Sequence, residues 1–154
     1  MLFRSSAKDF IIVFLMVAVL PAIGEELLFR GMIQNLLGEI TNRKHISVII
    51  TAFLFSAIHM QFFGFVPRFL LGMLLGFLFE WSGSLWWPVI AHFANNGSAV
   101  VFTYLYKHNM LSFDPDKLGT GSKGALIAGI SLFLCGVIIW RLREMVEKRE
   151  AKNV

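Results

Sequence analysis

Long apolar stretches separated by short polar segments dominate the chain. The first runs from Phe10 to Leu37, with Glu25, Glu26 and Arg30 as its charged residues. Because each stretch is long and bounded by turn-forming or charged residues, the pattern favours helices over strands. We expect helices at about 9–37, 45–60, 65–81, 85–106 and 124–147, with an exposed loop at 107–123.

These lengths indicate a membrane protein. Crossing about 30 Å of hydrocarbon takes about 20 mainly apolar residues, so 154 residues suffice for five spans. The predicted fold class is all-α, a polytopic transmembrane bundle of about five membrane-embedded helices around a polar cavity. We expect one domain over 1–154, with a motif core at about 15–105 and a last helix and basic tail at 124–154.

Individual residues refine the helix boundaries and contacts. Asp9 is a candidate N-cap of the first helix, and Pro21 and Gly24 are expected to bend that helix. Gly72 and Gly76 are four residues apart in the third helix, a spacing that lets another helix approach closely.

Composition and charge agree with a membrane location. Of the residues, 56% are hydrophobic and 16% are charged, unlike an ordinary soluble domain. The net charge of +4 comes from bases near the termini and in short polar segments, which suits membrane flanks better than a nucleic-acid surface. The single Cys135 excludes an internal disulfide.

The two adjacent glutamates of the first helix have different surroundings. Charged side chains near a bilayer centre cost about 2.5–3.5 kcal/mol each on insertion scales, so they are rare unless paired or used chemically. Glu26 and Arg30 are four residues apart and can pair on one helix face, whereas Glu25 points about 100° away. We therefore expect Glu26 to be structural and Glu25 to be available for chemistry.

Three further polar residues could act with Glu25. His92 and Asn96 are four residues apart on the fourth helix and can both donate hydrogen bonds to one oxygen. Glu25 could deprotonate a water that an imidazole such as His59 helps to orient. Together these four residues have the side chains that hydrolysis of an acyl bond requires.

The same residues form three motifs of a known family. Glu25–Arg30 has the form EExxxR, Phe55–His59 the form FxxxH, and His92–Asn96 the form HxxxN. Their order and spacing resemble those of the CAAX-protease and bacteriocin-processing (CPBP, or abortive-infection) family over about residues 15–105. The resemblance implies an intramembrane endopeptidase with an all-helical cavity open to one membrane face. Family members with a complete enzyme fold usually carry further helices ahead of the EExxxR segment, whereas about eight residues precede the first span here.

The resemblance also implies roles for the motif residues. Glu25 and His59 would activate the water, and His92 and Asn96 would stabilise the oxyanion. Glu25, His59 and His92 could instead bind Zn²⁺, which leaves the catalytic type open between glutamate and metal. The absence of an HExxH motif and the presence of Asn96, a poor zinc ligand, favour the mechanism without a cofactor.

Glu26 and Arg30 would be supporting residues in this family. The expected partners are a peptide or lipidated protein substrate and membrane lipids, with no nucleic acid, and the oligomeric state stays open. The expected location is a bacterial plasma membrane, as a multi-pass protein. The main alternative is a non-catalytic membrane immunity or scaffold protein that uses the polar cluster structurally. A transporter is disfavoured because the chain has no repeated half.

Overall fold

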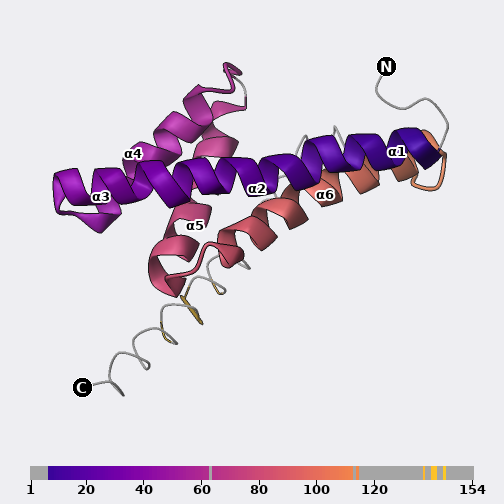
Figure 1. Cartoon of the computed structure of the whole chain (residues 1–154). Helices are drawn as coiled ribbons and strands as arrows, with labels where there is room; N and C mark the ends of the chain where they lie inside the picture. Colours follow the sequence, from indigo (N-terminus) through magenta and orange to yellow (C-terminus); the bar gives the residue numbers. More distant parts are fainter. Residues whose placement is uncertain are drawn as a thin grey trace. The chain divides into compact units, whose positions relative to one another are not determined.

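The computed structural model describes residues 7–62, 64–112, 114, 137, 140, 141 and 144, and all regular secondary structure within them is helical (Figure 1). The chain divides into two compact units, Met1–Gly97 and Ser98–Val154. Every candidate catalytic and supporting residue lies in the first unit. That unit therefore determines the geometry of the site.

The first unit begins with one continuous helical rod, Lys8–Thr41. Its backbone alternates between α-helical and π-helical turns in the order α1 (Ala7–Phe14), η1 (Leu15–Val19), α2 (Leu20–Glu26), η2 (Leu27–Gln34) and α3 (Asn35–Thr41). Pro21, which has no N–H to donate, is the second residue of α2, two positions after the end of the first π-helical segment. The N–H of Leu20 bonds to the carbonyl of Leu15, five residues back. The predicted irregularity near Pro21 thus takes the form of a π-to-α transition, and the helix continues through Gly24.

Both ends of the rod differ from those expected. The sequence predicts Asp9 as an N-cap, but the helix already includes Ala7 and places Asp9 in its first turn. An acidic side chain is stabilised there by the helix dipole. At the other end the helix extends past residue 37 to Thr41, and Asn42 ends it in a left-handed conformation with φ of 52°.

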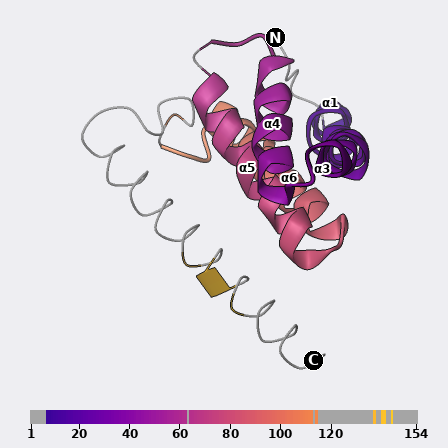
Figure 2. The same ribbon diagram turned by 90° about the vertical axis from the view of Figure 1, so that its left-hand side faces the viewer.

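A helical hairpin follows the rod. Its helices α4 (Lys44–Ala57) and α5 (Phe65–Ser82) lie side by side, and α4 also packs against η2 and α3 (Figure 2). α4 has only 14 residues, in agreement with the short second helix that the sequence predicts. Gly83 ends α5 with φ of 63°, and its N–H bonds to the carbonyl of Phe79.

The two small residues of α5 lie where the hairpin is tightest. A Cβ atom added to Gly72 would lie 3.1 Å from the Cα of Ala52, and one added to Gly76 would lie 2.8 Å from Cγ1 of Val48. At 2.8 Å a side chain at Gly76 would force a neighbour to move, and at 3.1 Å one at Gly72 would be tighter than most contacts in proteins. This contact confirms the predicted close approach of a second helix at Gly72 and Gly76.

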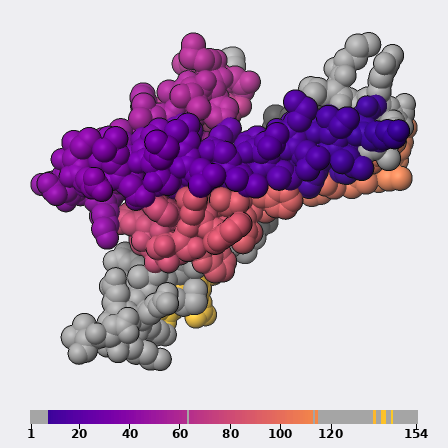
Figure 3. Space-filling view, viewed as in Figure 1, coloured from indigo at the N-terminus to yellow at the C-terminus, as the bar shows by residue number. Residues whose placement is uncertain are grey.

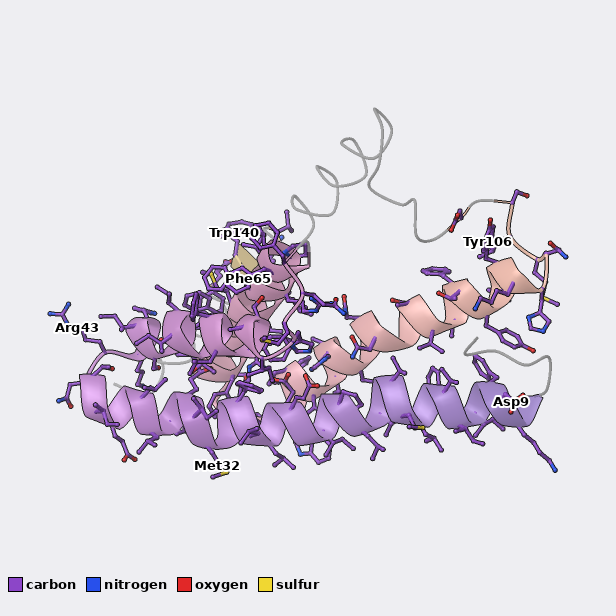
Figure 4. The ribbon with its side chains drawn as sticks, turned by 90° about the horizontal axis from the view of Figure 1, so that it is seen from above. Asp9, Met32, Arg43, Phe65, Tyr106 and Trp140 are labelled. Carbon is purple, nitrogen blue, oxygen red and sulfur yellow. The ribbon has the colours of Figure 1, made fainter. Side chains whose placement is uncertain are left out.

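The last described helix is α6 (Trp86–Lys107), which begins in the first unit and continues into the second. Its first half packs against the rod: the rings of Phe93 and Phe14 meet edge to face at 5.7 Å. A Cβ added to Gly97 would lie 3.5 Å from Cε2 of Phe14, an ordinary contact distance. Within the second unit, Thr103 donates a hydrogen bond to the carbonyl of Ala99, and Figure 4 labels Tyr106 near the C-terminal end of α6.

Two described helices, Lys8–Thr41 and Phe65–Ser82, are long and apolar enough to cross a membrane by length and composition. In the first, Met32, Leu36 and Ile40 form an exposed stripe with spacings of four, at 66%, 57% and 69% exposure. This face of η2 and α3 is uncovered in the space-filling view (Figure 3), and Figure 4 shows Met32 pointing away from the other helices of the unit. Such a stripe suits contact with lipid acyl chains.

The predicted all-helical fold class is confirmed, but the predicted bundle of about five membrane-embedded helices is not. The described residues form four helical rods, of which two meet the requirements for crossing a membrane. The predicted last helix and basic tail at 124–154 lie outside the described residues, apart from four isolated helical positions. Most of the predicted loop at 107–123 also lies outside them.

Candidate active site

A buried ion pair lies at the centre of the first unit. Arg30 and Glu26 are both 0% exposed, and Nη1 of Arg30 donates to Oε1 of Glu26 at 2.8 Å. Nη2 of Arg30 donates to the carbonyl of Gly72 at 2.9 Å, and the guanidinium carbon lies 4.9 Å from the centre of the Phe55 ring. The pairing of Glu26 with Arg30 confirms the expectation from their spacing of four.

Gln34 extends this arrangement by one helical turn and was not among the predicted residues. Its Nε2 donates to the carbonyl of Gly76 at 3.1 Å, so Arg30 and Gln34 contact carbonyls four residues apart on α5. The signal in the sequence is the spacing of four that links Glu26, Arg30 and Gln34 within an apolar helix. The rod is thus tied to α5 by two matching hydrogen bonds.

His92 of α6 connects the ion pair to the second glutamate. It is 2% exposed, and its Nδ1 lies 2.7 Å from Oε1 of Glu26. An ionised carboxylate only accepts hydrogen bonds, so Nδ1 is the protonated nitrogen of this contact. The other ring nitrogen, Nε2, lies 4.0 Å from Oε2 of Glu25. Glu25 Oε2 is buried, and the described residues offer it no hydrogen-bond partner.

Asn96 lies one turn beyond His92 on α6. Its Nδ2 is 3.1 Å from Nε2 of His92 and 3.1 Å from the carbonyl of Val17 in η1. These two contacts account for both hydrogens of the carboxamide. The helix segment before Pro21 therefore helps to position Asn96, a role that the sequence did not suggest for Val17.

His59 lies beside this cluster without joining its hydrogen bonds. It follows the end of α4 by two residues, and its Nδ1 bonds to the carbonyl of Phe55 at 2.8 Å. The Phe55 ring contacts both imidazoles, with centroid separations of 5.3 Å to His59 and 5.8 Å to His92. The structure thus brings Glu25, His92 and Asn96 together and places His59 next to them across an aromatic ring.

Within the described part of the chain, no three His, Cys, Asp or Glu side chains are grouped so that they could hold a metal ion. Glu25, His59 and His92, the possible ligand set, are thus not grouped as a three-ligand site among these residues.

Comparison with known proteins identifies the family. The model of the family "Type II CAAX prenyl endopeptidase Rce1-like" matches residues 7–98, a range that includes all the residues described above. The chain belongs to this Rce1-like family. The family is one of membrane proteases.

Among curated proteins, the chain resembles the uncharacterized protein YpbD of Bacillus subtilis (strain 168). The two are 33% identical over 79 residues, which make up 49% of this chain and 37% of YpbD. The chain thus spans little more than a third of the length of this relative. No solved structure matches the chain.

Proposed function

We propose that this protein is an intramembrane endopeptidase that hydrolyses a peptide bond near the membrane surface, with Glu25 as the general base. The observation that carries the proposal is the position of the buried Glu25 Oε2, which faces Nε2 of His92 at 4.0 Å and has no hydrogen-bond partner among the described residues. Membership of a protease family supports the same reading.

The separation of these two atoms suits a shared water. A water at about 2.8 Å from each could bond to both Glu25 Oε2 and His92 Nε2 once the Nδ2 hydrogen of Asn96 turns away from Nε2. Glu25 would take one proton from this water as its oxygen attacks the carbonyl carbon of the peptide. Collapse of the tetrahedral intermediate would break the C–N bond, and the proton held by Glu25 would pass to the departing amine.

His92 and Asn96 are proposed to stabilise the oxyanion. Glu26 accepts the Nδ1 hydrogen of His92, so an imidazole that takes up a proton from solvent at Nε2 would have that hydrogen to donate to the oxyanion. Asn96 would contribute the Nδ2 hydrogen that otherwise bonds to His92 Nε2. Two donors directed at a developing oxyanion are the usual requirement for stabilising it in acyl transfer.

His59 is proposed to assist Glu25 in orienting the water. Its position against Phe55, which also contacts His92, supports proximity to the reacting groups. Because its Nδ1 donates to the Phe55 carbonyl, the free nitrogen is Nε2, which can accept from or donate to a water. The role predicts a smaller loss on removal of His59 than on removal of Glu25.

The proposed mechanism uses no metal. If it is correct, dialysis against a strong chelator leaves peptidase activity unchanged, whereas loss of activity that Zn²⁺ restores would assign the reaction to a metal. The proposed substrate is a peptide or lipidated protein, on the strength of the prenyl endopeptidase family to which the chain belongs. We place the protein as a multi-pass protein in a bacterial plasma membrane, in keeping with its relative from Bacillus subtilis.

The test is cleavage of an internally quenched peptide that ends in a farnesylated CAAX sequence, alongside its unprenylated counterpart, by the protein in liposomes. Glu25→Gln removes the base at nearly constant volume and should lower kcat by about 10²- to 10⁴-fold. Glu39→Gln makes the same chemical change at an exposed position of α3 and should cleave at the wild-type rate.

Equal cleavage by the wild type and a folded Glu25→Gln variant would refute the role of Glu25. If the wild type cleaved neither peptide and the Glu25→Gln variant retained the protein's biological effect, the non-catalytic immunity or scaffold function would take precedence.

A further inference from the structure

A cavity with several polar residues in its lining lies apart from the residues proposed for catalysis. Its volume is about 510 Å³, and its walls come from the end of the first rod, the start of α4 and the end of α5. Its lining includes Gln34, Lys44 and Glu80 and none of Glu25, His59, His92 or Asn96. This cavity is therefore a separate candidate for ligand binding.

Two buried oxygens in its lining have no partner among the described residues. Gln34 is 4% exposed, and while its Nε2 is bound to the carbonyl of Gly76, its Oε1 accepts no hydrogen bond. The Glu80 side chain is 9% exposed; its Oε1 lies 3.2 Å from Nδ1 of His45, and its buried Oε2 accepts none. Unsatisfied buried acceptors are uncommon in proteins, and both of these belong to side chains that line one cavity.

These two oxygens suit a positively charged ligand group that donates hydrogen bonds. Both are acceptors, and the Glu80 carboxylate adds a negative charge. The cavity also borders Gly83 at the C-terminal end of α5, where the helix dipole contributes partial negative charge. A primary ammonium group has three N–H donors, so it can bond to Gln34 Oε1 and Glu80 Oε2 together.

The part of the lining at the start of α4 favours an anion. Lys44 is the first residue of α4 and lines the cavity, and the N-terminal end of a helix carries partial positive charge. An ammonium and the amides of a first helical turn together suit a phosphate group. The cavity thus offers the acidic residues Glu39 and Glu80 and the basic residue Lys44, which together complement a zwitterion.

The cavity lies where both helices that qualify as membrane spans end. Lys8–Thr41 ends three residues after Gly38 and Phe65–Ser82 ends one residue before Gly83, and both glycines line the cavity. In a membrane-embedded protein of this family, the ends of the spans lie at the level of the lipid headgroups. The accessible ligands there include phospholipids.

We propose that this cavity binds a phosphatidylethanolamine-type headgroup, with its primary ammonium on Glu80 Oε2 and Gln34 Oε1 and its phosphate on Lys44. Phosphatidylcholine has the same net charge, but its quaternary ammonium has no N–H to donate. The cavity therefore discriminates between the two lipids by hydrogen bonding, independently of whether the protein is a peptidase.

The experiment reconstitutes the full chain in nanodiscs of equimolar phosphatidylethanolamine and phosphatidylcholine with identical acyl chains, extracts it in mild detergent, and quantifies retained lipid by mass spectrometry. The wild type should enrich phosphatidylethanolamine about three- to tenfold, the effect of one or two net hydrogen bonds. Successive N-methylation of the headgroup should lower the enrichment stepwise, a measurement that needs no variant.

Matched variants locate the site. Glu80→Gln should bring the lipid ratio close to that of the bulk membrane, whereas Asp9→Asn, the same loss of charge in the first turn of α1 and outside the cavity lining, should leave the enrichment unchanged. Lys44→Ala should lower retention of both lipids with the ratio preserved. Equal retention of the two lipids by the wild type, or undiminished enrichment by folded Glu80→Gln, would overturn the proposal. Binding of soluble ethanolamine without lipid enrichment would also overturn it, because the ligand would then not be a lipid.

Discussion

Glu26 accepts from Arg30 and from His92 on the same oxygen, so a single buried carboxylate serves both the packing of the helices and the orientation of a catalytic candidate. The contact with His92 fixes which ring nitrogen carries hydrogen and directs the other one toward Glu25 and Asn96. The two adjacent glutamates therefore have different tasks. Glu26 holds the imidazole of His92, and Glu25 faces it.

Replacing Glu26 with Gln should destabilise the fold, since it leaves the fully buried guanidinium of Arg30 without its counter-charge. Removing one partner of a buried ion pair costs about 3–5 kcal/mol. Thermal unfolding in detergent measures the loss, with the exposed Glu39→Gln as control. A Glu26→Gln variant as stable as the wild type would show that the pair contributes little to folding.

Contacts between residues that are close in sequence were predictable from their spacing. The spacing of four residues is enough to pair Glu26 with Arg30, because helix geometry alone brings them together. The contact between Glu26 and His92 joins residues 66 positions apart, which no periodicity encodes. The same limit explains why the Val17 carbonyl was not foreseen as a partner of Asn96.

Among the elements, the close packing of α5 on α4 depends on Gly72 and Gly76, which face α4. A methyl group at Gly76 would lie 2.8 Å from Cγ1 of Val48 and 3.0 Å from Oε1 of Gln34, below ordinary contact distances. The glycine thereby keeps both the hairpin contact and the hydrogen bond that ties the rod to α5. Its small size is a packing requirement.

Gly76→Ala should therefore destabilise the protein by about 1–3 kcal/mol through overpacking. Gly31→Ala is the matched control: it lies within the rod, and an added Cβ there meets no atom within 4 Å. That variant should be neutral or more stable by about 0.5–1 kcal/mol, because alanine favours helix. Chemical unfolding of the two variants in parallel measures the difference, and equal stabilities would argue against the close packing of α5 on α4.

The extents of the elements were largely predictable. Apolar length and turn-forming residues place helices at 65–81 and 85–106, and the structure has Phe65–Ser82 and Trp86–Lys107. The ends of the first two rods were harder to predict. Helix 9–37 extends to Thr41, where only the left-handed Asn42 stops it, and helix 45–60 is Lys44–Ala57, which leaves His59 in the turn that follows.

For the molecule as a whole, the helix ends of the first unit define two sides. The turn at Arg43 and the segment at Ser84 adjoin the ends of the two candidate spans, whereas Phe62 lies between α4 and α5 at their other ends. An 18-residue helix is about 27 Å long, close to the thickness of the hydrocarbon core. α5 is therefore expected to cross the membrane, with the shorter α4 packed beside it.

Single cysteines at Arg43, Ser84 and Phe62, introduced on a Cys135→Ser background, test this arrangement. A membrane-impermeant thiol reagent should label the first two positions from one side of sealed vesicles and Phe62 from the other. Labelling of all three from the same side would indicate that α4 and α5 re-enter or lie along the interface.

The most direct test of the central claim is a double-mutant cycle on peptide cleavage with Glu25→Gln, His92→Gln and the combined variant. If both side chains act on one water, each single change should lower kcat/KM by about 10²- to 10⁴-fold, and the combined variant should be little worse than the weaker single variant. Losses that multiply, or wild-type activity in the Glu25→Gln variant, would contradict a shared catalytic role for Glu25 and His92.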